Sequence, residues 1–208
     1  MIDVSYILKY LKKIPQTILE FGSFNGDDGL KYKKAFPQCE VHSIEACPIL
    51  FDKLKFLIEH NIHIHHYAIT DRTGEIEFYQ SRIAANKAFG PTGSVLKATD
   101  YVRNLNKHIL YIKKPIKVPC ITIKDFCIKY NIKQIDLIHA DTQGNIIEVI
   151  NGFGEFKPKM LFAEVGMHQK YHGADEFKTT QAILEKINYS LIFKKGWDAL
   201  FVLKGQLT

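Results

Sequence analysis

The chain has 208 residues, of which 46% are hydrophobic and 24% charged, and its net charge at neutral pH is +6. These values are ordinary for one globular domain with a proper core, and they exclude a disordered or collagen-like chain. The apolar stretches are too short for a signal peptide or a membrane span, so we expect a cytoplasmic protein. The four cysteines show neither C-x-x-C nor zinc-ribbon spacing, which indicates reduced thiols.

Apolar and polar residues alternate in blocks along the chain, first with strand spacing and then with helical spacing. The expected strands are 17–21, 41–45, 62–69, 75–79, 116–123, 135–140, 160–165, 189–194 and 199–203. The expected helices are 28–36, 48–60, 123–130, 144–151 and 176–187. Strands that alternate with helices are typical of a mostly parallel sheet that is covered on both faces.

Residues 81–115 have little periodicity and contain the sequence Gly90-Pro91-Thr92-Gly93-Ser94. Loops of this length inside a compact domain are usually functional or disordered. We therefore expect a single domain over 1–208, in which 81–115 is a loop-rich lid or acceptor-binding insertion.

The last two expected strands are joined directly by Gly196-Trp197-Asp198. Such a tight turn requires antiparallel strands, because a parallel crossover needs a dozen or more residues. One antiparallel strand near the C-terminal end of a mostly parallel seven-stranded sheet is the Rossmann-like arrangement of class I methyltransferases. A plain NAD-binding domain lacks it.

A glycine-containing loop follows the first strand, which ends near Glu20, and the next strand ends at Glu45. Glycines allow a tight turn and close approach to a ligand, and an acid at Glu45 can accept both hydroxyls of a ribose. The glycine spacing differs from the dinucleotide fingerprint, and Asp27 and Asp28 at the helix start would repel a pyrophosphate. A cofactor with a ribose but no phosphate fits better, which points to S-adenosylmethionine.

Several further motifs follow in order along the chain. They are Glu20-x-Gly22-x-x-x-Gly26, Ile44-Glu45-Ala46, Ala68-Ile69-Thr70-Asp71, Thr92-Gly93-Ser94, 118–125, 135–144, Asn151-Gly152 and 161–165. With these motifs the chain resembles the FkbM family of S-adenosylmethionine-dependent methyltransferases over residues 17–165. The resemblance implies methyl transfer, commonly to a hydroxyl of a sugar or a natural product. The cofactor site that it implies comprises Glu20, Gly22, Ser23, Asn25, Gly26, Glu45, Ala46, Ala68, Ile69 and Asp141.

Two positions depart from the family pattern. Phe24 stands where the family usually has Asn, and Gln143 stands where it usually has Glu. The second change removes a charge close to the expected reaction centre, which leaves Asp141 in place but argues against a base at position 143.

The expected catalytic residues are Asp141, Glu164 and His168. Asp141 and Glu164 end successive buried strands, so two carboxyl groups should lie at the ligand-binding edge of the sheet and raise each other's proton affinity. His168 follows on the next loop, and with Ser94 it is expected to contact the substrate. No Asn/Asp-Pro-Pro-Tyr motif is present, which disfavours methylation of the amino group of a nucleobase. We therefore expect the methyl acceptor to be an oxygen atom.

Two groups of histidines could in principle bind a metal ion, but their spacing disfavours it. On a strand, His63 and His65 share one face and His66 points to the other, so a solvated strand face is expected. His168 and His172 have helical ligand spacing but are flanked by glycines that favour a loop, whereas His139 within a strand reads as a core residue. We therefore expect no metal.

The partner is expected to be a small-molecule or glycan acceptor. Most lysines are scattered, as on solvated faces, although a patch for an acidic substrate, such as a phosphorylated sugar or nucleic acid, is the alternative. No RNP-like motif or zinc knuckle supports nucleic acid. Two other functions remain open: a non-catalytic S-adenosylmethionine-binding or scaffold protein, and an NAD-dependent oxidoreductase, which the glycine spacing disfavours.

Overall fold

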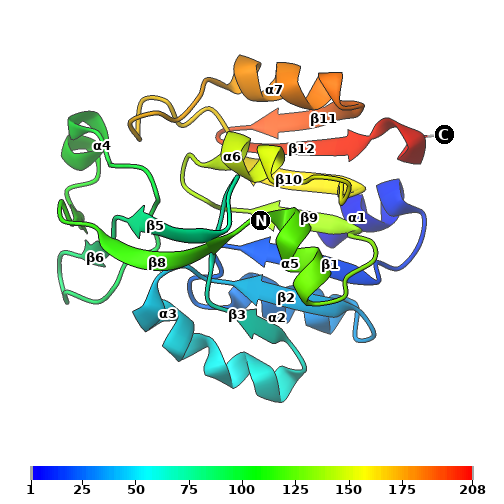
Figure 1. The fold of residues 1–208 in the computed structure, drawn as a ribbon, viewed down its shortest axis with the longest axis horizontal. Helices are drawn as coiled ribbons and strands as arrows, with labels where there is room; N and C mark the ends of the chain where they lie inside the picture. Colours follow the sequence, from blue (N-terminus) through cyan, green and yellow to red (C-terminus); the bar gives the residue numbers. More distant parts are fainter. Residues whose placement is uncertain (1, 208) are drawn as a thin grey trace.

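A seven-stranded sheet organises the fold in the computed structural model, which describes residues 2–207 (Figure 1). Its order is β11-β12-β10-β9-β1-β2-β3. The strands are β1 (Thr17–Phe21), β2 (Glu40–Ile44), β3 (His63–His65), β9 (Leu137–Ala140), β10 (Met160–Glu164), β11 (Tyr189–Lys195) and β12 (Asp198–Leu203). All neighbours are parallel except β12, which is antiparallel to both β10 and β11. The expected Rossmann-like class I methyltransferase fold is confirmed, including its C-terminal antiparallel strand.

Helices cover both faces of this sheet. The helices of residues 2–207 are α1 (Val4–Leu11), α2 (Asp27–Ala35), α3 (Pro48–Lys53), the 3-10 helix η1 (Leu54–His60), α4 (Asp100–Leu105), which lies away from the main sheet, α5 (Ile123–Lys129), α6 (Ile146–Asn151), α7 (Phe177–Lys186) and the 3-10 helix η2 (Lys204–Gln206). One buried cluster packs α5, α6 and α7 on the sheet, and a second packs α1, α2 and η1 on the other face. Within residues 2–207, no helix has the length and apolar character needed to cross a membrane.

Local sequence signals explain where helices begin. Thr122 caps α5, because its side chain accepts a hydrogen bond from the Asp125 amide at 2.9 Å, and Pro48 occupies the first turn of α3. The expected helix over 48–60 is correct in extent, but after Lys53 it continues as a 3-10 helix. Helix α1 was not expected from the sequence, although Asp3 caps it by accepting from the Ser5 amide at 2.8 Å.

The single strand expected over 62–69 is wrong, because the chain leaves the main sheet within it. Strand β3 pairs with β2, whereas β4 (Ala68–Ile69) pairs with β8 (Ile116–Ile121) in a second sheet of order β4-β8-β5. Strand β5 (Gly74–Phe78) completes that sheet. Between β3 and β4 the His66 ring packs on Phe51 and its Nε2 lies 3.0 Å from the Ala46 carbonyl oxygen, which fixes the turn.

The segment 81–115 is more regular than its sequence indicates. It contains β6 (Ser81–Ile83), which pairs antiparallel with β7 (Ile109–Tyr111), and helix α4 lies between them. The remaining residues form loops. Figure 1 shows these elements and the second sheet grouped at the left of the view, beyond one end of the main sheet.

The expectation of a solvated histidine face is wrong for His65. This side chain is buried, and its Nε2 lies 3.0 Å from Nδ1 of buried His42, while the rings of Phe126 and Tyr130 pack against it. Burial lowers the pKa of His42 to about 3 and that of His65 to about 4. His139 is a core residue as expected, with its Nδ1 3.0 Å from the Tyr32 hydroxyl. Among the described residues, no three His, Cys, Asp or Glu side chains are arranged to hold a metal.

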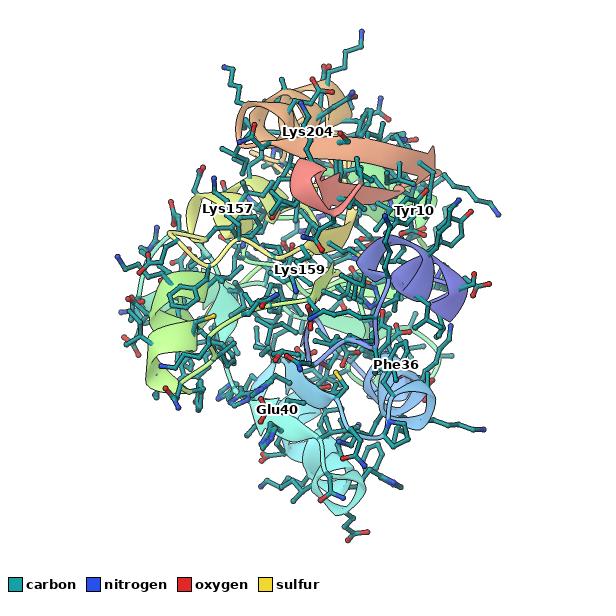
Figure 2. The ribbon with its side chains drawn as sticks, turned by 90° about the vertical axis from the view of Figure 1, so that its right-hand side faces the viewer. Tyr10, Phe36, Glu40, Lys157, Lys159 and Lys204 are labelled. Atoms are coloured by element: carbon teal, nitrogen blue, oxygen red, sulfur yellow. The ribbon has the colours of Figure 1, made fainter. Side chains whose placement is uncertain are left out.

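The opposite edge of the sheet, where parallel strands begin, is held by ion pairs. Buried Asp136 accepts a hydrogen bond from the Gln16 amide at 2.6 Å and pairs with Lys159 Nζ at 2.7 Å. Figure 2 views this face, with Lys159 near its centre and Glu40, the first residue of β2, below it. The four cysteines are buried and free, so they form no disulfide.

Candidate active site

Strand register brings three predicted residues together at the carboxyl edge of the sheet. Phe21 in β1 pairs with Ile44 in β2 on one side and with Ala140 in β9 on the other. The residues that follow these strand ends, Gly22, Glu45 and Asp141, therefore lie next to one another. Open α/β sheets bind ligands at this edge.

The loop after β1 requires glycine at its first position. Gly22 has φ of 78°, and a Cβ built on it would lie 2.1 Å from the Asp141 carbonyl oxygen. Because no other side chain fits this space, Gly22 lets β1 and β9 approach closely below the site. Gly26, with φ of 80°, caps α2, and Asp27 and Asp28 occupy its first turn.

A cavity opens beside this edge and encloses about 610 Å³, its mouth included. Of the predicted cofactor and substrate residues, the cavity is lined by Gly22, Glu45, Ala46, Ala68, Ile69, Ser94 and Asp141. The structure thus places seven predicted residues, from five separate segments of sequence, around one space.

Other lining residues were not identified from the sequence as part of the site. They include Cys47, Leu50, Tyr67, Phe78, Gln80, Thr142 and Asn145. Leu50 and Phe78 were recognisable only as apolar positions of a helix and a strand. Nothing in the local sequence distinguishes them from core residues, because the cavity arises where the second sheet meets the main one.

Glu45 is buried and already accepts two backbone hydrogen bonds. Its Oε2 lies 3.0 Å from the Phe24 amide, and its Oε1 lies 2.8 Å from the Cys47 amide. Burial raises the pKa of Glu45, and the two amides counteract this by stabilising the carboxylate. The carboxylate is therefore fixed in place at the cavity wall.

Four predicted cofactor residues lie outside the cavity lining. The Glu20 carboxyl group points towards β2, where Ser43 Oγ donates to its Oε2 at 2.5 Å, and burial raises its pKa to about 8. Ser23 Oγ donates to the Ile44 carbonyl at 3.3 Å. Asn25 is exposed and hydrogen-bonds Asp27, while Gly26 caps α2. Ser23, Asn25 and Gly26 thus shape the loop, and a direct contact of any of the four with cofactor stays a prediction.

Asp141 and Glu164 lie close together, joined by the amide of Gln143. Gln143 Nε2 is 2.5 Å from Asp141 Oδ1 and 2.8 Å from Glu164 Oε2. Burial raises the pKa of Asp141, and burial together with the charge of Asp141 raises the pKa of Glu164 to about 9. The pair therefore keeps a proton at neutral pH, because two like charges so close together resist full ionisation.

The remaining predicted residues take separate places. Ser94 is buried and its hydroxyl donates to the Gln143 carbonyl at 2.8 Å, so it joins the cavity wall to the loop after β9. His168 is exposed in the loop after β10 and is not among the cavity-lining residues. A catalytic or substrate role of His168 stays a prediction without a contact that supports it.

The cavity suits a ligand that has both cationic and apolar groups. Glu45 and Asp141 supply negative charge along its sheet edge, while Leu50 and Phe78 supply apolar surface. S-adenosylmethionine carries a sulfonium and an ammonium beside a ribose and an adenine ring. Acids next to the glycine loop favour these cations, whereas they would oppose the pyrophosphate of NAD.

Comparison with known proteins agrees with this geometry. The sequence profile described as "Methyltransferase FkbM domain" matches residues 21–191. No curated protein sequence matches the chain. The fold resembles the fibrillarin pre-rRNA processing protein of Methanococcus jannaschii, with 14% identity, 93% of this chain and 69% of that chain covered, and a TM-score of 0.53. It also resembles a putative caffeoyl-CoA O-methyltransferase from Staphylococcus aureus, with 11% identity, 99% and 85% covered, and a TM-score of 0.51.

A third resemblance is to the plantazolicin methyltransferase BpumL, solved in complex with SAH. The identity is 16%, the TM-score is 0.41, and 76% of this chain and 42% of that chain are covered. The chain thus spans less than half the length of that protein. At these identities the structural likenesses concern the fold, and the family rests on the profile. The chain belongs to the FkbM methyltransferase family, whose cofactor is S-adenosylmethionine.

Proposed function

We propose that this protein methylates a hydroxyl oxygen of a small molecule or glycan, and that the acceptor carries negative charge. The observation that carries the reaction type is the Asp141–Glu164 pair at the carboxyl edge of the sheet, beside the cavity. A hydroxyl is a poor nucleophile until a base removes its proton, and a carboxyl pair with raised pKa values is a suitable base near neutral pH.

Bound S-adenosylmethionine supplies a methyl group on a positively charged sulfur. The methyl group would pass to the acceptor oxygen and S-adenosylhomocysteine would leave with the electron pair of the broken bond, so the acceptor must lose its proton. Asp141 takes the hydroxyl proton, with Glu164 beside it to share that proton. Glu45 would hold the ribose, and the Gly22 turn lets the cofactor approach the backbone. Alignment of the two reactants supplies much of the acceleration.

The charge of the acceptor is inferred from the segment 81–115, which contributes Gly90, Pro91, Gly93, Ser94 and Val95 to the cavity wall. This segment has seven Lys and Arg residues against one acid, Asp100, so its net charge of +6 equals that of the whole chain. Its five lysines are exposed, and none forms an ion pair within the described residues: Lys87, Lys97, Lys107, Lys113 and Lys114. A segment so charged beside a binding site favours an anionic substrate.

A test of the reaction type uses Asp141→Asn. We expect turnover to fall by ~10²-fold or more, the usual worth of a general base, while affinity for S-adenosylhomocysteine stays within about tenfold. Turnover that survives, or that falls only in proportion to affinity, would make Asp141 a cofactor anchor. Binding of S-adenosylhomocysteine without turnover on any acceptor would favour the non-catalytic alternative.

A second test addresses the acceptor. Purified protein is incubated with S-adenosylmethionine and matched pairs of sugars, each neutral sugar beside its phosphate or uronic acid, and S-adenosylhomocysteine production is measured. We expect turnover only with charged members, and Lys113→Glu/Lys114→Glu should raise the KM for them. The matched control is Lys186→Glu, in α7 away from the segment. Equal use of neutral and charged sugars would contradict an anionic acceptor.

A further inference from the structure

Gln143 sits at the centre of a buried hydrogen-bond network. It lies in the turn after β9 with φ of 51°, and only 8% of the residue is exposed. Both amide hydrogens are used, one towards Asp141 Oδ1 and one towards Glu164 Oε2. The amide nitrogen must face the carboxyl groups, since the amide oxygen has a different partner.

That partner is Tyr171, a buried residue of the loop after β10. Its hydroxyl donates to Gln143 Oε1 at 2.7 Å and lies 3.3 Å from the Thr92 carbonyl oxygen. The main chain of Gln143 makes a second link, because Ser94 Oγ donates to its carbonyl oxygen at 2.8 Å. Gln143 thus connects the carboxyl pair with Thr92 and Ser94, of which Ser94 lines the cavity.

We propose that Gln143 is a positioning residue that holds Asp141 and Glu164 as one proton-sharing pair and couples this pair, through Tyr171 and Ser94, to residues 92–94, of which Gly93 and Ser94 line the cavity. A catalytic role for this network rests on the proposed function, in which Asp141 is the base. The hydrogen bonds of the network are present whatever the reaction is.

An amide suits this position better than an acid because of the surrounding charges. Asp28 on α2, Glu45 after β2 and Asp198 on β12 add negative charge around the pair, and Lys170 in the loop after β10 adds positive charge. A glutamate at 143 would add a third buried carboxyl group and remove both donors. Like charges in a buried site resist ionisation, so the pair would hold its proton to higher pH.

The first experiment measures the carboxyl titrations of Asp141 and Glu164 by carbon-13 NMR in the ligand-free protein. Gln143→Glu should raise the apparent pKa values of the pair by about one pH unit or more. Gln181→Glu, the same substitution on an exposed face of α7, should leave them unchanged. Should Q143E fail to fold, Gln143→Leu removes the donors without adding charge and should shift the titrations in the same direction. Wild-type titrations in the variant would overturn the proposal.

The second experiment tests the link to the wall. Tyr171→Phe removes the hydroxyl alone, and we expect amide hydrogen exchange at Ser94 and Leu96 to accelerate about tenfold or more. Tyr101→Phe, at an exposed position of α4 in the same segment, is the control. Unchanged exchange in Y171F would overturn the coupling. Because neither readout involves an acceptor, success here with no turnover on any acceptor would reject the proposed function alone.

Discussion

The Glu45 carboxylate and the Phe24 amide are joined by a hydrogen bond of 3.0 Å. The acid that is expected to bind ribose therefore also holds the glycine loop in shape. Phe24 has φ of 45°, a left-handed conformation that costs roughly 1–2 kcal/mol for a residue with a Cβ. The usual Asn of the family adopts this conformation more readily, so in this chain the contact with Glu45 and the packing of Phe24 near Leu50 must offset the cost.

Gly22→Ala should destabilise the protein and abolish cofactor binding. A Cβ at this position would lie 2.1 Å from the Asp141 carbonyl oxygen, and the positive φ disfavours any side chain. We expect a loss of about 2 kcal/mol or more in the free energy of unfolding, measured by urea denaturation. Gly205→Ala, which has open space around it, is the control. A variant as stable as the control, with wild-type affinity for S-adenosylhomocysteine, would show that the loop has another conformation.

Glu20→Gln should make the protein more stable at alkaline pH. Burial raises the pKa of Glu20 to about 8, so the folded state keeps a proton that the unfolded state releases near pH 4.5. The free energy of unfolding therefore falls as pH rises from about 4.5 to 8, and a neutral glutamine avoids this loss. At pH 8.5 we expect the free energy of unfolding of the variant to exceed that of wild type by about 2 kcal/mol. At pH 5 the two proteins should differ little. Exposed Glu59→Gln should show neither effect, and a variant less stable than wild type at pH 8.5 would indicate that Glu20 is ionised and paired.

The sequence was sufficient for the architecture of the main sheet, because each of its strands carries its own apolar pattern and the terminal turn fixes the antiparallel pair. The sequence pattern could not predict that the strand breaks after His65, where the alternating residues 62–69 leave the main sheet and enter the second one. That break depends on pairing with Ile116–Ile121, which is more than fifty residues away. The segment 81–115 was unreadable for the same reason, since β6 and β7 are stabilised by each other across α4.

The site was predictable where it follows from strand ends. Glu45, Asp141 and Glu164 each end a strand or follow one directly, and parallel strands share an edge. Tyr171 had no such signal, because it reaches Gln143 from an irregular loop, and its contact depends on the path of that loop. Glu20 was expected to face the cofactor; in the structure its carboxyl group accepts a hydrogen bond from Ser43, and its contact with the cofactor stays a prediction.

His65→Phe should weaken the dependence of stability on acid. Burial lowers the pKa of His65 to about 4, below the value of about 6.5 in the unfolded chain. The neutral folded form is fully stable above pH 6.5, and stability is lost as pH falls towards 4 because the unfolded state binds protons. When the pH is lowered from 7 to 5, the free energy of unfolding, measured by urea denaturation, should fall by about 1–2 kcal/mol less in the variant than in wild type. The same pH dependence in H65F as in the exposed control His172→Phe would place His65 in water.

We propose that S-adenosylmethionine binds at the carboxyl edge of the sheet, between the loop after β1 and Glu45. The most direct test is isothermal titration of S-adenosylhomocysteine into the Glu45→Ala variant, with Glu40→Ala as its partner. Glu40 begins the strand that Glu45 follows, so the control changes the same residue type at the opposite edge, on an exposed site (Figure 2). We predict that Glu45→Ala weakens binding by ~2 kcal/mol or more, about thirtyfold, because charge-assisted hydrogen bonds are lost, and that Glu40→Ala binds as wild type does. Equal affinities in the two variants would contradict the account.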